Sequence, residues 1–333
     1  MTLQVLSLAE LEAYQAAASW ASRLKALVKH QSEHWPAFQQ AVKSLAGLRR
    51  REISVQGNLV SLQHNPRRIG SVSAIVEGGE IEKRPCFLCS ENAPAGQAGL
   101  MLTPNYVLLC NPAPIFASHF TIAALEHRPQ CLVGEVEVFL EHAELLSPEM
   151  AVFFNGARAG ASAPDHLHFQ ACPATALPLM KSLAAVGECL SGHVLPVAAE
   201  TREFAGTVFV LLTARERHAL EEMLSHALKL YEETQPGSGE LVNVIAWFQK
   251  PLWLVGLFLR RRHRPSCYYA EGPENLLVSP GAVEMAGVIV LPRGSDYAKI
   301  KEQDVLRIYQ EVSMPCEFYQ EFCSKLIGRW KRG

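Results

Sequence analysis

Residues 166–170 alternate between polar and apolar side chains, and this pattern constrains the fold of the chain more than any other feature. His166, His168 and Gln170 are separated by single apolar residues. Successive side chains on a β-strand point to opposite faces, so these three share one face while their neighbours enter a core. Burying polar groups without partners costs folding free energy. The segment therefore predicts a strand with a core on one face and a site on the other.

The two histidines on this strand also carry a chemical possibility. A neutral imidazole whose one nitrogen is held by a backbone carbonyl presents the other nitrogen as a nucleophile. Attack by such a nitrogen on phosphorus would give a phosphoramidate. Gln170 could donate a hydrogen bond to a phosphate oxygen, but it cannot act as a general base. The structural alternative is a pair of core histidines on a buried strand.

The residues that precede this strand favour the functional interpretation. A small-residue loop, Gly156–Ser162, follows a predicted strand at Met150–Asn155. Consecutive backbone N–H groups in such a loop can surround a phosphate. We therefore expect the loop and the histidine strand to form one anion-binding site.

Composition limits the classes of protein that the chain can belong to. The formal net charge is -2, so no global positive field attracts nucleic acid. The longest apolar stretch, near Leu252–Leu259, is far shorter than the roughly 20 residues of a membrane helix. The N-terminus lacks a basic leader. The number of cysteines, nine, is odd, and together these features favour reduced thiols and a cytoplasmic location. We expect no nucleic acid and no membrane as partner, and a homodimer is compatible with the sequence.

Periodicity along the chain predicts an α+β fold with a mostly antiparallel sheet. Two helices are expected between Leu8 and Leu48, around Pro36, and a later helix over Cys131–Leu145. Strands are expected in the first part of the chain at Ile53–Leu62, Tyr106–Cys110, His119–Leu125 and Met150–Asn155. The second part repeats this order with a strand at Phe204–Leu212, a helix at Ala214–Glu233, a hairpin at Leu241–Trp247 and Leu252–Leu259, a strand at Gly287–Leu291 and helical residues at Glu302–Trp330.

These elements suggest three units. Residues 1–52 form an N-terminal helical arm, residues 53–195 a catalytic half, and residues 196–333 a second half with C-terminal helices. The histidine strand belongs to the catalytic half. The second half has a similar order of elements without the histidines, so a duplicated fold is a hypothesis from element order alone.

A Cys-x-x-Cys pair, Cys86 and Cys89, lies in a stretch rich in glycine and proline. Two thiolates at this spacing can bind one tetrahedral zinc ion. A redox pair usually begins a helix after a strand, and the pattern here predicts no such helix. No second Cys-x-x-Cys follows, so the remaining ligands should be histidines. Two free thiols without a metal are the alternative.

The stretch from Phe154-Asn155-Gly156 to Asp165-His166-Leu167-His168-Phe169-Gln170 resembles the active-site segment of galactose-1-phosphate uridylyltransferases. Their relatives in the histidine-triad superfamily include diadenosine tetraphosphate phosphorylases and GDP-L-galactose phosphorylases. The resemblance implies a histidine-triad-like fold, with two such halves, in which the middle histidine, His168, becomes nucleotidylated. Gln170 occupies the place of a third histidine in the hydrolase branch, which favours transfer over hydrolysis. Asp165 is an extra residue relative to that pattern.

The same resemblance implies a ligand set for the cysteine pair. Uridylyltransferases with a similar Cys-x-x-Cys segment, here called the knuckle (residues 86–89), use it to bind a structural zinc ion. The other ligands are a histidine after a later strand and the first histidine of His-x-His. Here those are His127 and His166, and His119 is the competitor for the third place. We expect the zinc ion to orient the strand of His168 rather than to polarise a phosphate.

Further residues are expected to meet the nucleotide. Asn111 matches a position that in the superfamily often contacts the nucleotide ribose or base, and Asn155, Gly156 and Gly160 are also expected to contact the nucleotide. Ser162, Gln170 and loop amides would stabilise the charge that develops on phosphorus. For Asn111 the alternative is an Asn-Pro turn.

The densest basic run of the chain is Arg260–Arg264. It could bind nucleic acid, lie near a substrate phosphate, or form a solvated strand end, and a single run on a net-acidic chain supports the first weakly. Arg67 and Arg68 could likewise meet phosphates or form a solvated edge.

The expected activity is nucleotidyl transfer with ping-pong kinetics. His168 would attack the α-phosphate of a nucleotide sugar or dinucleoside polyphosphate, and phosphate or a sugar phosphate would then accept the nucleotide. The alternatives are a histidine-triad-type hydrolase of nucleotide phosphoanhydrides and a non-catalytic, zinc-stapled nucleotide-binding protein.

Overall fold

The computed structural model of the chain describes residues 3–74, 81, 84–190 and 197–330, without the side chains of 185–190. Its strands form two sheets, one of ten strands and one of three. In spatial order the large sheet contains β1 (Gln4–Val5), β4 (Ala98–Thr103), β5 (Tyr106–Cys110), β6 (Phe120–Ala124), β8 (His168–Pro173), β7 (Met150–Asn155), β11 (Val242–Gln249), β12 (Leu252–Leu259), β10 (Thr207–Ala214) and β9 (Val197–Phe204). Every pair in it is antiparallel except β1 with β4. The predicted α+β class is confirmed.

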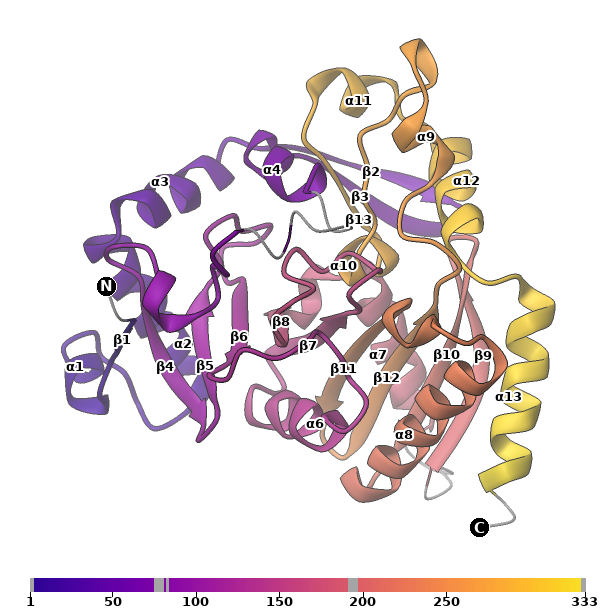
Figure 1. Cartoon of the computed structure of the whole chain (residues 1–333), viewed down its shortest axis with the longest axis horizontal. Coiled ribbons are helices and arrows are strands. Elements are labelled where there is room, and N and C mark those ends of the chain that lie inside the picture. The colour runs from indigo at the N-terminus through magenta and orange to yellow at the C-terminus, as the bar shows by residue number, and fades with distance from the viewer. Residues whose placement is uncertain (1–2, 75–80, 82–83, 191–196, 331–333) are drawn as a thin grey trace.

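The large sheet consists of two halves with the same order of elements (Figure 1). The first runs β5, β6, α6 (Val136–Leu145), β7, β8, and the second runs β9, β10, α8 (Arg217–Thr234), β11, β12. They meet at the antiparallel pair of β7 and β11, where Asn155 lies opposite Asn243. The spatial order is therefore mirrored about this pair. The expected two-half architecture is confirmed.

Helices cover one face of the large sheet. They are α2 (Trp20–His34), α6, α8 and α13 (Cys316–Trp330), and they pack apolar side chains of the sheet into one core. Phe154 and Phe169, on β7 and β8, belong to this core. The side chains that alternate with them, including His168 and Gln170, consequently face the other side of the sheet.

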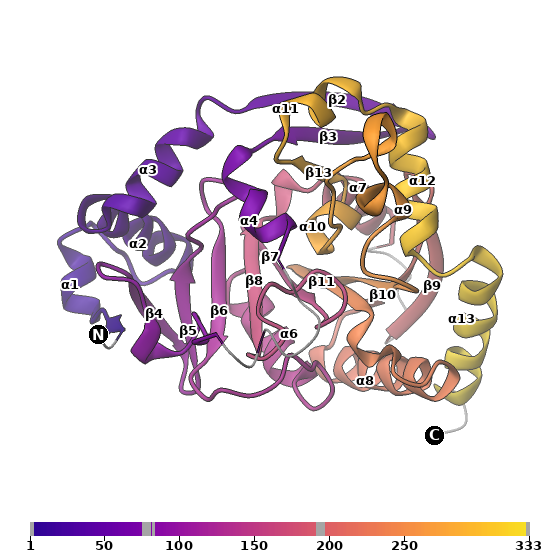
Figure 2. The same cartoon turned by 45° about the horizontal axis from the view of Figure 1, so that its top comes forward.

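The three-stranded sheet lies on that other side. It is formed by β2 (Arg49–Val55), β3 (Asn58–His64) and β13 (Val288–Leu291), with β13 parallel to β3. A second core joins this sheet to α7 (Pro178–Leu190), α10 (Ala282–Met285), α12 (Glu302–Val312) and the second half. Figure 2 shows β2 and β3 opposite α6 and α8 across the large sheet. Strands from both ends of the chain thus share one sheet.

Two predicted strands are in fact hairpins. The predicted strand Ile53–Leu62 is β2 and β3, which turn at Gln56 and Gly57 with φ of 47° and 77°. The predicted strand Phe204–Leu212 is the end of β9 and the start of β10, which turn at Ala205 and Gly206 with φ of 52° and 81°. Two-residue turns with positive φ at both positions usually carry Asn-Gly or Asp-Gly, and neither turn has that signature.

Helices lie in the expected regions, but the N-terminal region holds three helices instead of two, and the helix predicted from Cys131 begins at Val136. The N-terminal arm consists of α1 (Leu8–Glu12), α2 and α3 (Pro36–Leu45), with Pro36 in the first turn of α3. The expected helix at the C-terminus is divided into α12 and α13 around Pro315, which has no N–H to continue a helix. No helix in the described parts of the chain is long and apolar enough to cross a membrane. The expected domain boundary at 195 lies outside the described residues.

Candidate active site

His168 lies at the first residue of β8, in the middle of the first half. The strand begins here, and His166 precedes it in a turn rather than on the strand itself. The Nδ1 atom of His168 lies 2.8 Å from the carbonyl oxygen of His166. A carbonyl can only accept, so Nδ1 carries the proton and Nε2 keeps its lone pair. Burial lowers the pKa of His168 to about 4, so the imidazole is neutral at neutral pH.

A glutamine absent from the sequence-based site residues holds the backbone of His168. Gln130 accepts from the His168 N–H (2.8 Å), and its Nε2 donates to the carbonyls of His168 (2.9 Å) and Asn155 (2.8 Å). Only 2% of Gln130 is exposed, so these bonds are shielded from water. Gln130 thereby clamps β8 to the end of β7. It lies in a loop without periodicity, so the sequence carries no signal for this role.

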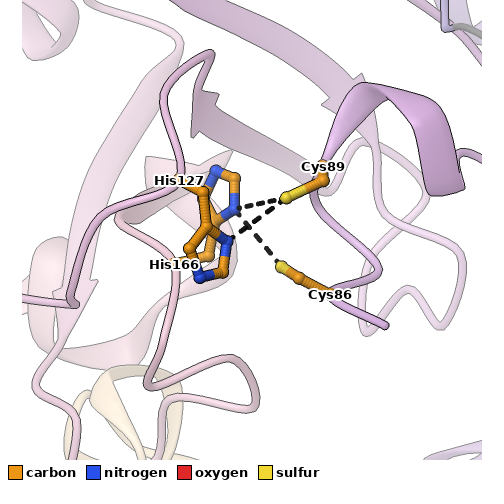
Figure 3. A group of neighbouring side chains, drawn as sticks. All are labelled: Cys86, Cys89, His127 and His166. Atoms are coloured by element: carbon orange, nitrogen blue, oxygen red, sulfur yellow. Dashed lines mark hydrogen bonds between the residues drawn. The ribbon is translucent and has the colours of Figure 1, made fainter. Parts of the chain in front are cut away.

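Two cysteines and two histidines converge beside this strand (Figure 3). Their ligand atoms lie within 4.8 Å of one another in the group Cys86, Cys89, His127 and His166. The sulfur of Cys86 is 3.3 Å from His166 Nδ1, and that of Cys89 is 3.2 Å from His127 Nδ1. All four residues are those expected from the sequence. His119, the competitor, lies elsewhere in the site.

The cluster fits a tetrahedral zinc ion. Zn–S bonds of about 2.3 Å and Zn–N bonds of about 2.0–2.1 Å place sulfur and nitrogen roughly 3.5 Å apart, close to the observed separations. His166 Nε2 lies 2.8 Å from the carbonyl oxygen of Ala124, which makes Nε2 the donor and leaves Nδ1 free for a metal. Without a cation, burial and the neighbouring Cys86 raise the pKa of Cys89 to about 11. A bound metal would replace that proton.

Asp165, the residue that departs from the superfamily pattern, connects the turn before β8 to the knuckle. Its carboxylate lies 2.9 Å from the guanidinium of Arg84, which precedes the cysteine pair. The same guanidinium lies over the ring of Phe87, between the two cysteines. The extra residue therefore fastens the knuckle to the histidine segment.

Gln170 lies two residues beyond His168 and contacts His119. His119 Nε2 is 3.0 Å from Gln170 Oε1, and His119 Nδ1 accepts from the backbone N–H of Ile115 at 3.2 Å. His119 is almost completely buried, and burial together with the nearby Arg68 lowers its pKa to about 3. His119 is consequently a neutral part of the candidate active site and lies outside the metal cluster.

The small-residue loop Gly156–Ser162, called the glycine-rich loop below, is tightly packed against the second half. The N–H groups of Gly156 and Arg158 donate to the carbonyls of Val242 and Glu240. A Cβ added at Gly156 would overlap the carbonyl of Glu240, and one added at Gly160 would lie 2.8 Å from the Cα of Gly281. Gly160 also has a φ of +100°. These two glycines are thus required by close backbone approach.

Asn155 joins the loop to a buried arginine of the second half. Its Oδ1 accepts from Asn243 Nδ2 (2.8 Å) and from the N–H of Ala282 (2.7 Å). Asn243 also donates to the carbonyl of Ala159 at 2.7 Å and accepts from Arg260 Nη1. The guanidinium of Arg260, completely buried, further donates to the carbonyls of Pro280, Val312, Arg262 and His263. Arg260 is therefore a structural cation at the junction of the halves.

The other arginines of the basic run point in two directions. Arg261 and Arg262 are exposed, as expected of a solvated strand end. Arg264 points inward, where it donates to the carbonyls of Val72 and Ala74 and borders the cavity described next.

A cavity of about 650 Å³ opens over His168. Its wall contains all but one of the expected catalytic and nucleotide-contacting residues, the exception being Gly156, whose backbone packs against β11 instead. Those residues are His168, Gln170, Ser162, Asn111, Asn155 and Gly160. The second half adds His263, Arg264, Ser279, Gly281 and Glu284.

The lining of this cavity is chemically mixed. Phe87, Leu88 and Leu109 form an apolar part near the knuckle. Arg68 also borders the cavity, and its buried Nε has no hydrogen-bond partner among the described residues. A site with an apolar part, an arginine and a neutral histidine suits a ligand that carries both a ring and phosphate.

Comparison with solved structures identifies the fold. Yeast Ap4A phosphorylase in complex with Ap4A matches with a TM-score of 0.55 and 14% identity, over 87% of this chain and 97% of that one. This chain shares its fold with that phosphorylase. The fold expected from the resemblance to diadenosine tetraphosphate phosphorylases is therefore confirmed.

Other comparisons are more distant. An ADP-glucose phosphorylase from Arabidopsis thaliana with bound ADP-glucose matches with a TM-score of 0.32 and 15% identity, over 80% of this chain and 99% of that one. A family model described as a domain of unknown function, DUF4922, matches residues 27–173. That match ends with β8, so it contains the cysteine pair and the histidine strand. Among curated proteins no sequence matches this chain.

Proposed function

We propose that this protein is a nucleotidyltransferase or phosphorylase that forms a covalent nucleotidyl intermediate on His168. One observation carries the proposal: Nδ1 of His168 is held by the His166 carbonyl, which leaves Nε2 as the free nitrogen of a side chain that borders the cavity. That arrangement selects the tautomer in which Nε2 is the nucleophile. The low pKa keeps the ring neutral, which nucleophilic attack requires.

The chemistry follows from this tautomer. Nε2 attacks the α-phosphorus, an N–P bond forms, and the P–O bond to the leaving group breaks with its electron pair. The leaving group is a sugar phosphate from a nucleotide sugar, or a nucleoside polyphosphate from a dinucleoside polyphosphate. The ring then carries a positive charge, and its Nδ1–H continues to donate to the His166 carbonyl, which stabilises that charge. An oxygen of the acceptor attacks the same phosphorus and releases His168. No proton transfer is needed when the leaving group and the acceptor are phosphate oxygens.

Substrate features correspond to parts of the cavity. The apolar side chains of Phe87, Leu88 and Leu109 suit a nucleobase, and Asn111 also lines the cavity. Arg68 offers a cation for phosphate oxygens. Gln170 and Ser162 complete the polar wall around the α-phosphate. We infer that the substrate is a nucleotide sugar or a dinucleoside polyphosphate.

The metal cluster has a supporting role in this proposal. Cys86, Cys89, His127 and His166 would hold a zinc ion, which cross-links the knuckle, the loop after β6 and the turn before β8. Because the carbonyl of His166 holds His168, fixing His166 also fixes the nucleophile. The ion would therefore act on structure rather than on phosphate.

The second candidate is a hydrolase in which water is the acceptor. Gln170 argues against it, because an amide can neither accept nor deliver a proton in place of a third histidine. A protein that only binds nucleotides would leave the neutral, preoriented His168 without a role.

Labelled substrates separate the candidates. Nucleoside diphosphate sugars and dinucleoside polyphosphates labelled at the α-phosphorus are incubated with the protein, with and without inorganic phosphate. Acid-labile, base-stable label on His168 that phosphate discharges supports transfer. Turnover in water alone supports hydrolysis, and binding without label or turnover contradicts both.

A further inference from the structure

We propose that His119 is a positioning residue that fixes the side-chain amide of Gln170, so that its NH2 group faces the phosphate undergoing transfer. The inference rests on the proposed function of His168. It adds a residue to the reaction and assigns the direction of an amide on which charge stabilisation depends.

The direction follows from hydrogen-bond polarity. The N–H of Ile115 can only donate, so His119 Nδ1, at 3.2 Å, is the unprotonated acceptor. A neutral imidazole with free Nδ1 carries its proton on Nε2. That proton is donated to the side chain of Gln170 at 3.0 Å, which requires Oε1, rather than the NH2 group, to face His119. The NH2 group is left for the cavity that Gln170 borders.

Fixing this amide has a chemical consequence. A free glutamine amide can rotate by half a turn, which exchanges a donor for an acceptor at nearly the same position. An oxygen directed at the equatorial oxygens of phosphorus would repel them, whereas an N–H stabilises their developing charge. His119 disfavours the wrong orientation, since rotation of the amide would set two donors, the Nε2–H of His119 and the NH2 group of Gln170, against each other.

The surroundings of His119 keep its imidazole in one orientation and one protonation state. Its ring stacks on that of Phe153, with centroids 6.1 Å apart, and meets the ring of Phe116 edge-on, with centroids 6.2 Å apart. Burial holds the imidazole neutral across the physiological range, so the Nδ1 acceptor is not lost to protonation. The ring is thereby prevented from turning to offer its other nitrogen.

The donor that sets the tautomer is itself anchored. Gln63, on β3, donates to the carbonyl of Ile115 at 3.1 Å, and Asn65 donates to that of Pro114 at 3.2 Å. Both amides are buried. Because β3 pairs with β13, a chain of contacts leads from the three-stranded sheet through Ile115 and His119 to Gln170.

The test replaces His119 with two amide side chains of different length. In His119→Asn, the shorter side chain can accept from Ile115 but cannot reach Gln170. In His119→Gln, the longer amide places an N–H donor near the former Nε2. We expect His119→Asn to slow nucleotidylation of His168 about 10- to 100-fold, which is less than the roughly 10²–10³-fold loss on removing an oxyanion donor outright. His119→Gln should restore most of that loss. Substrate affinity and zinc content should change little.

A double-mutant cycle identifies the route of the effect. In a Gln170→Ala background, His119→Asn should lower the rate less than about twofold, because the two residues act through one bond. An undiminished additional loss there, or a wild-type rate in His119→Asn alone, would overturn the proposal. Failure of the wild-type protein to label at all would instead contradict the function proposed for His168.

Nuclear magnetic resonance gives a readout that needs neither activity nor a variant. Nitrogen shifts of His119 in the wild-type protein should report a proton on Nε2 and none on Nδ1. A proton on Nδ1 would contradict the orientation even if every variant failed to fold.

Discussion

The two halves of the large sheet share an order of elements but differ in the connection between their last two strands. Residues 156–167 separate β7 from β8, whereas only Lys250 and Pro251 separate β11 from β12. The long connection carries the glycine-rich loop and His166, and the strand after it carries His168 and Gln170. In contrast, β12 reads LWLVGLFL and is buried throughout.

This difference indicates that the two halves have different roles. The first half carries the candidate reactive residues on a strand and a loop, and the second half stabilises that loop through Asn243 and Arg260. The second half also forms the far wall of the cavity. A duplicated framework can therefore retain one site and use its other copy as support.

The largest expected effect distinguishes β8 from β12, the equivalent strand of the second half, by what a substitution on each does to activity and to stability. His168→Gly should abolish turnover and labelling while the melting temperature and zinc content stay near wild type, because only the nucleophile is removed. Leu254→Ala on β12 is the matched control, since it removes a completely buried side chain. That variant should lose about 2–5 kcal/mol of unfolding free energy and still label. Near wild-type activity in His168→Gly would end the assignment of the site to β8.

The next effect tests whether the metal cluster holds the first half together. Cys86→Ser should lower zinc content and unfolding temperature together, because structural zinc binding is coupled to folding. Cys131→Ser, at an exposed cysteine outside the cluster, should change neither. Metal analysis and thermal unfolding measure both quantities. Full stability of Cys86→Ser without metal would remove the structural role proposed for the ion.

A smaller effect tests the support that the second half provides. Arg260→Lys keeps the charge but loses the five-donor fork, so it leaves Asn243 or backbone carbonyls unpaired. We expect a loss of about 2–3 kcal/mol in denaturant unfolding and a higher KM, since Asn243 also holds Ala159. The neighbouring Arg261→Lys, exposed at the surface, should stay within about 0.5 kcal/mol of wild type. Equal behaviour of the two variants would contradict the structural role of Arg260.

The smallest effect concerns the single acidic side chain that the second half contributes to the described cavity wall. Burial raises the pKa of Glu284 above its usual 4.5. A raised pKa means that folding favours the protonated form, so stability is full below about pH 4.5 and falls as the pH rises through the folded pKa.

Glu284→Gln removes this titration, and the new amide oxygen can still accept from the Gly281 N–H. The variant should melt slightly above wild type at pH 8, and the gain should disappear near pH 4. Thermal unfolding across this range measures it. A gain that grows toward acid pH would show that the carboxylate is stabilised in the folded state instead.

Several features followed from the sequence alone because each depends on residues close together in the chain. Alternation over residues 166–170 predicted which side chains face the core, and His168 and Gln170 do line one cavity wall. The Cys-x-x-Cys spacing and the superfamily resemblance predicted the four residues that converge. The order of strands and helices predicted two halves.

Other features were decided only by tertiary structure. The hairpins at Gln56-Gly57 and Ala205-Gly206 lack a strong turn signature, and the backbone reverses there because both residues adopt positive φ. Gln130, His119 and Arg260 carry no periodic signal, since their roles depend on partners that lie up to 52 positions away in the chain. Sequence alternation records which face a side chain occupies. Which partner it meets there is decided when distant strands are brought together, because hydrogen bonds depend on distance and direction rather than on spacing along the chain.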